Sequence, residues 1–96
     1  MTSTEEIREF LDNLCPFQGE GDLVESLEKE GWDCQCDGAN WESVYYNCYH
    51  INKDFSIQIN ADPYLHTLSI YVSRDGETLF RRHYKGYYEL EEESED

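Results

Sequence analysis

The sequence predicts an α+β domain in which two N-terminal helices precede an antiparallel sheet of four to five strands. Apolar residues recur at helical spacing over the first 30 residues and at alternating positions from Trp32 onward. Turn-forming pairs such as Asp75-Gly76 separate the alternating runs. Because the chain has 96 residues, we expect a single domain over residues 1–90, followed by an acidic disordered tail over residues 91–96.

The first helix is expected at about residues 4–14. Ser3 and Glu6 have the spacing of a capping box, and Pro16 ends the helix because the residue before a proline leaves helical geometry. One face of this helix is apolar and consists of Ile7, Phe10, Leu11 and Leu14.

A second helix is expected after the turn at Gly19-Glu20-Gly21. Asp22 is the predicted N-cap with Glu25 as its capping-box partner, and Gly31 is the predicted C-cap residue. The buried stripe of this helix comprises Leu23, Val24 and Leu27.

Alternating residues predict two hairpins. A two-residue loop at Asn52-Lys53 brings the apolar faces of the first hairpin into register. The predicted pairs in that hairpin are His50 with Phe55, Cys48 with Ile57, and Tyr46 with Ile59.

The second hairpin is predicted to turn at Asp75-Gly76, which places Val72 opposite Leu79 and Tyr71 opposite Phe80. One face then packs on the core, and the other presents an aromatic surface that is a candidate for dimerisation or partner binding. That surface would consist of Tyr71, Phe80 and Tyr84, and the candidates for an extension of the sheet are Tyr87, Tyr88 and Leu90.

The charge is strongly negative and unevenly distributed. Asp and Glu number 22 against seven Lys and Arg, for a net charge of −15. Residues 1–43 carry −10, residues 44–85 carry +1, and residues 86–96 carry −6. Such a chain is not suited to direct contact with nucleic acid or anionic lipid, which need cationic surface. No apolar run is long enough to cross a bilayer.

The N-terminal residues lack the basic and apolar run of a secretory signal, so a cytoplasmic location is expected. For a phage protein this would be the host cytoplasm. In that reducing compartment most cysteines should remain thiols. The chain has four, at Cys15, Cys34, Cys36 and Cys48.

Only one group of residues resembles a metal site. Cys34, Cys36, Cys48 and His50 supply zinc-type ligands, yet strand positions i and i+2 lie about 7 Å apart. Sulfurs on one zinc lie only about 3.8 Å apart. The usual C-x₂-C spacing is also missing, so no metal or cofactor is expected, and a zinc-stabilised structural domain is kept as an alternative. No phosphate loop or hydrolase motif occurs, which predicts that the protein is not an enzyme.

The predicted partner-binding surface is the acidic face of the two helices together with an aromatic residue in a polar loop. Its carboxylates could instead be a solvated face that keeps the protein soluble. A basic strip at Arg74, Arg81, Arg82 and Lys85 is expected to pair with helix carboxylates. The candidate partner-binding residues are Glu5, Glu6, Glu9, Asp12, Glu25, Glu28, Glu30 and Trp41.

In its size, its acidic helices over residues 3–30 and its acidic tail over residues 89–96, the chain resembles the small acidic inhibitors that phages and mobile elements deploy against host defence. These include nucleic-acid mimics of the anti-restriction, anti-CRISPR and glycosylase-inhibitor kinds, which share no signature sequence. The resemblance implies a monomer or homodimer that inhibits a basic protein such as a nuclease or an RNA-guided effector.

Overall fold

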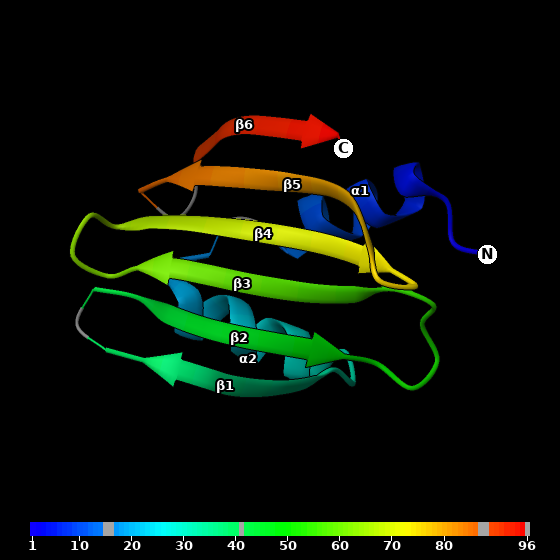
Figure 1. Cartoon of the computed structure of the whole chain (residues 1–96), viewed down its shortest axis with the longest axis horizontal. Coiled ribbons are helices and arrows are strands. Elements are labelled where there is room, and N and C mark those ends of the chain that lie inside the picture. The colour runs from blue at the N-terminus through cyan, green and yellow to red at the C-terminus, as the bar shows by residue number, and fades with distance from the viewer. Residues whose placement is uncertain (15–16, 41, 87–88, 96) are drawn as a thin grey trace.

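The computed structural model describes residues 1–14, 17–40, 42–86 and 89–95. Its six strands form one antiparallel sheet in sequence order (Figure 1). The α+β class with two leading helices is confirmed, although the sheet has six strands rather than four to five. The elements are α1 (Thr4–Leu14), α2 (Glu20–Lys29), β1 (Asp33–Ala39), β2 (Val44–Tyr49), β3 (Ser56–Asp62), β4 (Thr67–Arg74), β5 (Glu77–Lys85) and β6 (Glu89–Glu95).

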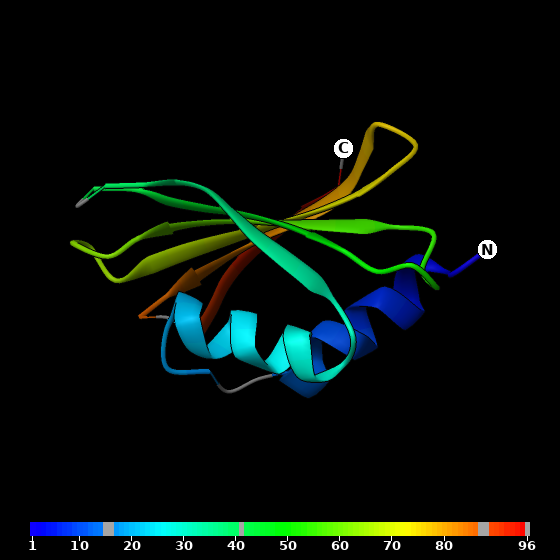
Figure 2. The same ribbon diagram turned by 90° about the horizontal axis from the view of Figure 1, so that it is seen from below.

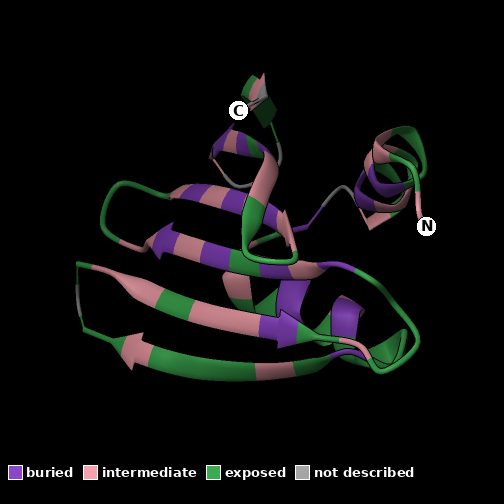
Figure 3. Cartoon of the chain, turned by 45° about the vertical axis from the view of Figure 1, so that its right-hand side comes forward, coloured by how far each residue is buried: buried purple, intermediate pink, exposed green. Residues whose placement is uncertain are grey.

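Both helices cover the same face of the sheet (Figure 2). Helix α2 lies behind β1 to β3 and α1 lies behind β4 and β5 (Figure 1). Neither helix is long and apolar enough to span a bilayer. The core fills the layer between helices and sheet, and strands β3 to β5 show buried residues at alternate positions (Figure 3). Its fully buried side chains include Ile7, Leu11, Phe17, Leu23, Leu27, Ile57, Ile59, Leu68, Ile70, Val72 and Phe80.

Helix α1 has the predicted boundaries and the predicted cap. The Glu6 amide donates to Ser3 Oγ at 3.1 Å, and the Ser3 hydroxyl donates to the Glu6 carboxylate at 3.2 Å. Ile7 and Leu11 are buried against the sheet. The Ser3 side chain therefore caps the first turn and sets the start of this helix.

The predicted start of the second helix was wrong by three residues. Helix α2 begins at Glu20, and its N-cap is Gly19, which makes no side-chain cap hydrogen bond. Asp22 lies inside the first turn, and its carboxylate accepts a hydrogen bond from the Gln18 amide at 2.9 Å. The carboxylate thus closes the loop that enters the helix, and its charge suits the positive end of the helix dipole.

The predicted C-cap is confirmed. Gly31 has a φ of 94° and donates to the Glu28 carbonyl, while the Trp32 amide donates to the Leu27 carbonyl. These two bonds form a Schellman motif, which requires a left-handed residue. A Cβ on Gly31 would also lie 2.9 Å from Nε2 of His50.

The β2–β3 pairing has the predicted register, with Cys48 opposite Ile57 and Tyr46 opposite Ile59. The turn lies one residue earlier than predicted, because the Lys53 amide donates to the His50 carbonyl at 3.1 Å. The buried faces of both strands therefore fixed the register even though the turn differs.

The β4–β5 hairpin turns where expected, but its predicted register was wrong. Asp75 and Gly76 have φ values of 52° and 81°, as a type I′ turn requires. A β-bulge then shifts the pairing, so that Val72 lies opposite Phe80 and Tyr71 opposite Arg81.

This shift reverses the two faces of β5, because successive strand residues point to opposite sides. Phe80 is fully buried and Tyr84 is 2% exposed, so the predicted exposed aromatic face does not exist. Of its three members, Tyr71 alone is not buried.

The predicted disordered tail was also wrong over residues 91–95, which lie in strand β6. Acidic residues of β6 pair with basic residues of β5, including Arg82 with Glu93 and Lys85 with Glu89. Opposite charges on facing strand positions stabilise a pair, and this compensates for the weak strand propensity of glutamate. Asp96, Tyr87 and Tyr88 lie outside the described residues.

A buried ion-pair network joins β5, β6 and α1. The Arg82 side chain is 4% exposed and donates to Glu93 at 2.6 Å, to Asp12 at 2.7 Å and to the Tyr84 hydroxyl at 3.3 Å. Arg8 donates to the second Glu93 oxygen at 2.9 Å. Burial alone would lower the pKa of Arg82, but these hydrogen bonds raise it, so the guanidinium stays charged.

Replacing Arg82 by Met should lower the free energy of unfolding by about 2 kcal/mol, because the network loses its charged hydrogen bonds. Urea denaturation measures this change. The matched control is Arg81→Met, an exposed position on the same strand, whose effect should stay within about 0.5 kcal/mol. Equal effects at both positions would contradict the role assigned to the network.

Candidate functional site

Arg8, Arg74 and Arg82 are engaged in internal ion pairs. Arg8 contacts Glu5 at 2.6 Å, in addition to its contact with Glu93. Arg74 donates to the Thr2 carbonyl at 2.5 Å and lies 3.7 Å from the Asp54 carboxylate. The predicted pairing of the basic strip with helix carboxylates is therefore found at Arg82 and Asp12, although Arg82 faces the core rather than solvent.

Most of the candidate acidic residues on α1 have partners within the protein. Glu5 pairs with Arg8, Glu6 belongs to the helix cap, and Asp12 pairs with Arg82. Glu9 is exposed and has no ion-pair partner among the described residues. Asp12 thus attaches the helix to the sheet, whereas Glu5 and Glu6 make their contacts within α1 and its cap.

A second group of carboxylates has fewer basic partners within the protein. We call it the α2–β1 acidic surface, and it includes the exposed Glu28 and Glu30 at the end of α2. Glu25 contacts Lys29 at 3.6 Å with both side chains exposed, a pairing of small energetic value. Lys29 is the only basic residue between positions 20 and 39. The surface comprises Glu25, Glu28, Glu30, Asp33 and Asp37.

The charge of this surface affects the pKa of two thiols that lie close to it. Burial raises the pKa of both Cys34 and Cys48, and the negative charges of Glu28 and Asp33 raise it further. Carboxylates from the helix and from β1 therefore act on the same region. Trp41, the remaining candidate partner-binding residue, lies outside the described residues.

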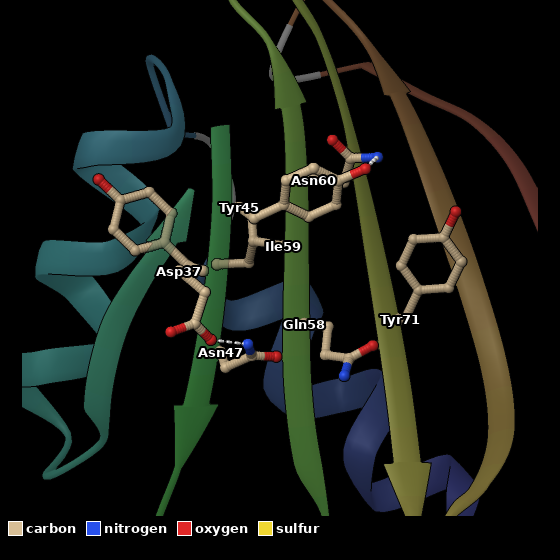
Figure 4. Close-up of a pocket in the computed structure, with 8 residues that line it drawn as sticks. Asp37, Tyr45, Asn47, Gln58, Ile59, Asn60 and Tyr71 are labelled. Carbon is tan, nitrogen blue, oxygen red and sulfur yellow. Dashed lines mark hydrogen bonds between the residues drawn. The ribbon is translucent and has the colours of Figure 1, made fainter. Parts of the chain in front are cut away.

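The open face of the sheet carries a shallow groove of about 420 Å³. Figure 4 shows Tyr45 and Tyr71 over the strands, with the amide side chains of Asn47 and Gln58 further along β2 and β3. Asp37, which accepts a hydrogen bond from Asn47, connects the groove to the α2–β1 acidic surface. The other lining residues are Tyr46, Ile59 and Asn60.

Such a lining can stack on flat groups and hydrogen-bond to them, but it holds no nucleophile beside a base. This groove was not predicted, because outward positions were considered only on the second hairpin, where Tyr71 was assigned to an aromatic face. The outward positions of β2, β3 and β4 carry tyrosines and amides, and this pattern was the available signal.

A serine and a histidine meet elsewhere on the open face. The Ser69 hydroxyl lies 2.9 Å from Nδ1 of His83. Ser69 lies in a central strand paired on both sides, opposite Asn60 and His83, so its backbone belongs to the sheet ladder. The pair lines a second hollow of about 310 Å³, whose other lining residues are Arg81, Glu91, Glu92 and Ser94.

The four predicted zinc ligands are only partly brought together. Cys34 and Cys48 face each other across β1 and β2. The Asn52 amide donates to Nδ1 of His50 at 3.0 Å, so Nε2 carries the hydrogen and donates to the Glu30 carbonyl at 3.0 Å. Both ring nitrogens are occupied, and the described residues contain no group of three or more His, Cys, Asp or Glu suited to a metal.

Addition of one equivalent of zinc should therefore leave the Tm unchanged, because no tetrahedral ligand set is available without breaking the His50 bonds. Thermal unfolding with and without zinc measures this. The control is His50→Gln, which should respond to zinc no differently from the wild type. A zinc-dependent rise in Tm that this substitution abolishes would instead support the zinc-stabilised structural domain.

Comparison of the chain with protein-family models, with curated proteins and with solved structures finds no match.

Proposed function

We propose that this protein is a non-catalytic acidic inhibitor that binds a basic nucleic-acid-binding protein and occupies the place of the nucleic acid. The supporting observation is the imbalance of paired charge. Three arginines are held in internal ion pairs, whereas the α2–β1 acidic surface is exposed and residues 20–39 contain Lys29 as their single Lys or Arg. The inhibitor would belong to the anti-CRISPR or anti-restriction type of mimic.

The spacing of the α2 carboxylates supports imitation of a phosphate backbone. From Glu25 to Glu30 the helix rises roughly 7.5 Å, at about 1.5 Å per residue. Glu25 and Glu28 are three residues apart in α2 and so lie on one face of the helix, about 4.5 Å apart along its axis. A helix presents these charges on a stiff support, so little ordering is required on binding.

The expected partner is a nuclease, an RNA-guided effector or a similar protein whose nucleic-acid channel is lined by arginine and lysine. The negative field would accelerate encounter with such a surface and repel nucleic acid and anionic membranes. Asp37 extends the acidic surface to Tyr45, so a partner arginine that reaches over the β1 edge can pair with the carboxylate and stack on the ring. A cytoplasmic site of action is part of this proposal.

The alternatives are less well supported. The zinc-stabilised domain requires His50, whose ring nitrogens are both hydrogen-bonded. The dimerising module requires an exposed aromatic face that includes Phe80 and Tyr84, which are buried. A monomer or a homodimer is compatible with the inhibitor proposal, and sedimentation at several concentrations distinguishes them.

The immobilised protein should capture nucleic-acid enzymes from a cell lysate, and these should elute early as salt is raised, because salt screens exposed charges. Mass spectrometry of each salt fraction measures this. The control is the same chain with Glu28→Gln and Glu30→Gln. Partners that are not basic, or that persist at high salt, would contradict the proposal.

The double variant Glu28→Lys/Glu30→Lys should raise the Kd for a captured partner at least tenfold, because it places cations at the centre of the proposed interface. Titration calorimetry with the purified partner measures this. The matched control Glu9→Lys/Glu91→Lys changes the net charge equally at exposed positions of α1 and β6, and should raise the Kd less than threefold.

If both double variants weaken binding equally, total charge rather than a defined surface governs the interaction. If neither weakens it, the partner binds elsewhere. Circular dichroism of each variant establishes that the fold is intact before binding is compared.

A further inference from the structure

Two cysteines face each other across the edge of the sheet. Cys34 on β1 is the direct register partner of Cys48 on β2. Opposite residues on antiparallel strands have Cα atoms about 4.5–5.5 Å apart. A disulfide spans Cα separations of about 4.4–6.8 Å. Each thiol also influences the pKa of the other, as expected of neighbouring sulfurs.

The neighbouring cysteine does not have this arrangement. Cys36 lies opposite Tyr46 rather than a thiol, and its own thiol donates to the Gly38 carbonyl at 3.7 Å. Its diagonal separation from Cys48 is about 7–8 Å, beyond the range of a disulfide. The register thus selects one pair among the three described cysteines.

Strand β1 is weakly attached to the rest of the sheet, so a cross-link to β2 would stabilise it. It lies at the sheet edge, none of its residues is buried, and a register irregularity falls between Cys36 and Gly38. Its sequence of Asp, Cys, Gln, Gly and Ala has weak strand propensity. Backbone hydrogen bonds to β2 therefore supply most of its attachment.

We propose that Cys34 and Cys48 form a reversible intrachain disulfide by exchange with a small-molecule disulfide. The half-buried Cys34 loses its proton and attacks one sulfur of the reagent, which breaks the reagent S–S bond and expels one thiolate. Cys48, which is fully buried, then loses its proton and attacks the Cys34 sulfur, expelling the second thiolate. The protein is oxidised by two electrons, the reagent is reduced by two, and the two protons pass to the released thiolates.

The local charges favour a particular class of reagent. Burial and the nearby carboxylates of Glu28 and Asp33 disfavour both thiolates and repel an anionic disulfide such as that of glutathione. A cationic disulfide such as cystamine is attracted to the same carboxylates. Exchange with cystamine should therefore be at least threefold faster than exchange with glutathione disulfide at equal concentration and pH.

The test incubates the reduced full-length protein with cystamine or glutathione disulfide, blocks remaining thiols and digests after glutamate. Cleavage at Glu42 separates Cys34 and Cys36 from Cys48, whereas no Lys or Arg lies between Cys34 and Cys48 for trypsin to cut. The expected product is one linked pair of peptides in the wild type. The bond closes a loop of 15 residues and should raise the Tm by roughly 10 °C.

The variants define the pair. Cys36→Ser should retain both the linked peptides and the Tm rise, whereas Cys34→Ser and Cys48→Ser should lose both. Because Cys48 is fully buried, its variant could unfold, and the half-buried Cys34 position then decides the outcome. A bond that involves Cys36 or Cys15, a disulfide between two chains, a mixed disulfide that does not close, or thiols that remain reduced in excess cystamine would each overturn the proposal.

Discussion

The ion-pair network around Arg82 is the constraint on which the arrangement of this protein depends. A guanidinium at a core-facing position of a strand is costly to bury, and it is retained here because Asp12, Glu93 and the Tyr84 hydroxyl surround it. Those partners come from α1, β6 and β5. One buried cation thus attaches a helix and an edge strand to the sheet, and the Phe80 ring lies 5.2 Å from Arg8 and 6.0 Å from Arg82.

The same network determines where the surplus negative charge is found. Arg8, Arg82 and Lys85 face carboxylates of α1 and β6, so that side of the molecule is partly neutralised. Helix α2 and strand β1 have Lys29 alone. The sequence places similar numbers of carboxylates on both helices, and only the pairing of the cations makes the two sides electrostatically different.

The elements with one clearly buried face could be predicted from the sequence. Helix α1, the end of α2 at Gly31 and the β2–β3 register all follow from local patterns that agree with the core. The β5 register could not be obtained from the turn alone, because the bulge reverses its faces after Thr78. Comparing the two faces of β5 would have given the correct register. Phe80, Arg82 and Tyr84 form a better core face than Leu79, Arg81 and His83. Strand β6 was missed because a run of glutamates has low strand propensity, and its stability comes from bases on β5.

Solubility alone accounts for the charge on the two edges of the sheet better than for the charge on α2. Exposed edge strands invite pairing with other chains, and charged residues prevent it, which is sufficient reason for the glutamates of β6 and for Asp33 and Asp37 on β1. Glu28 and Glu30 lie at the end of a helix, where negative charge opposes the helix dipole. Carboxylates that destabilise their own helix and protect no edge require another reason for their presence. Contact with a cationic partner provides one, because binding would relieve the repulsion that the free protein carries.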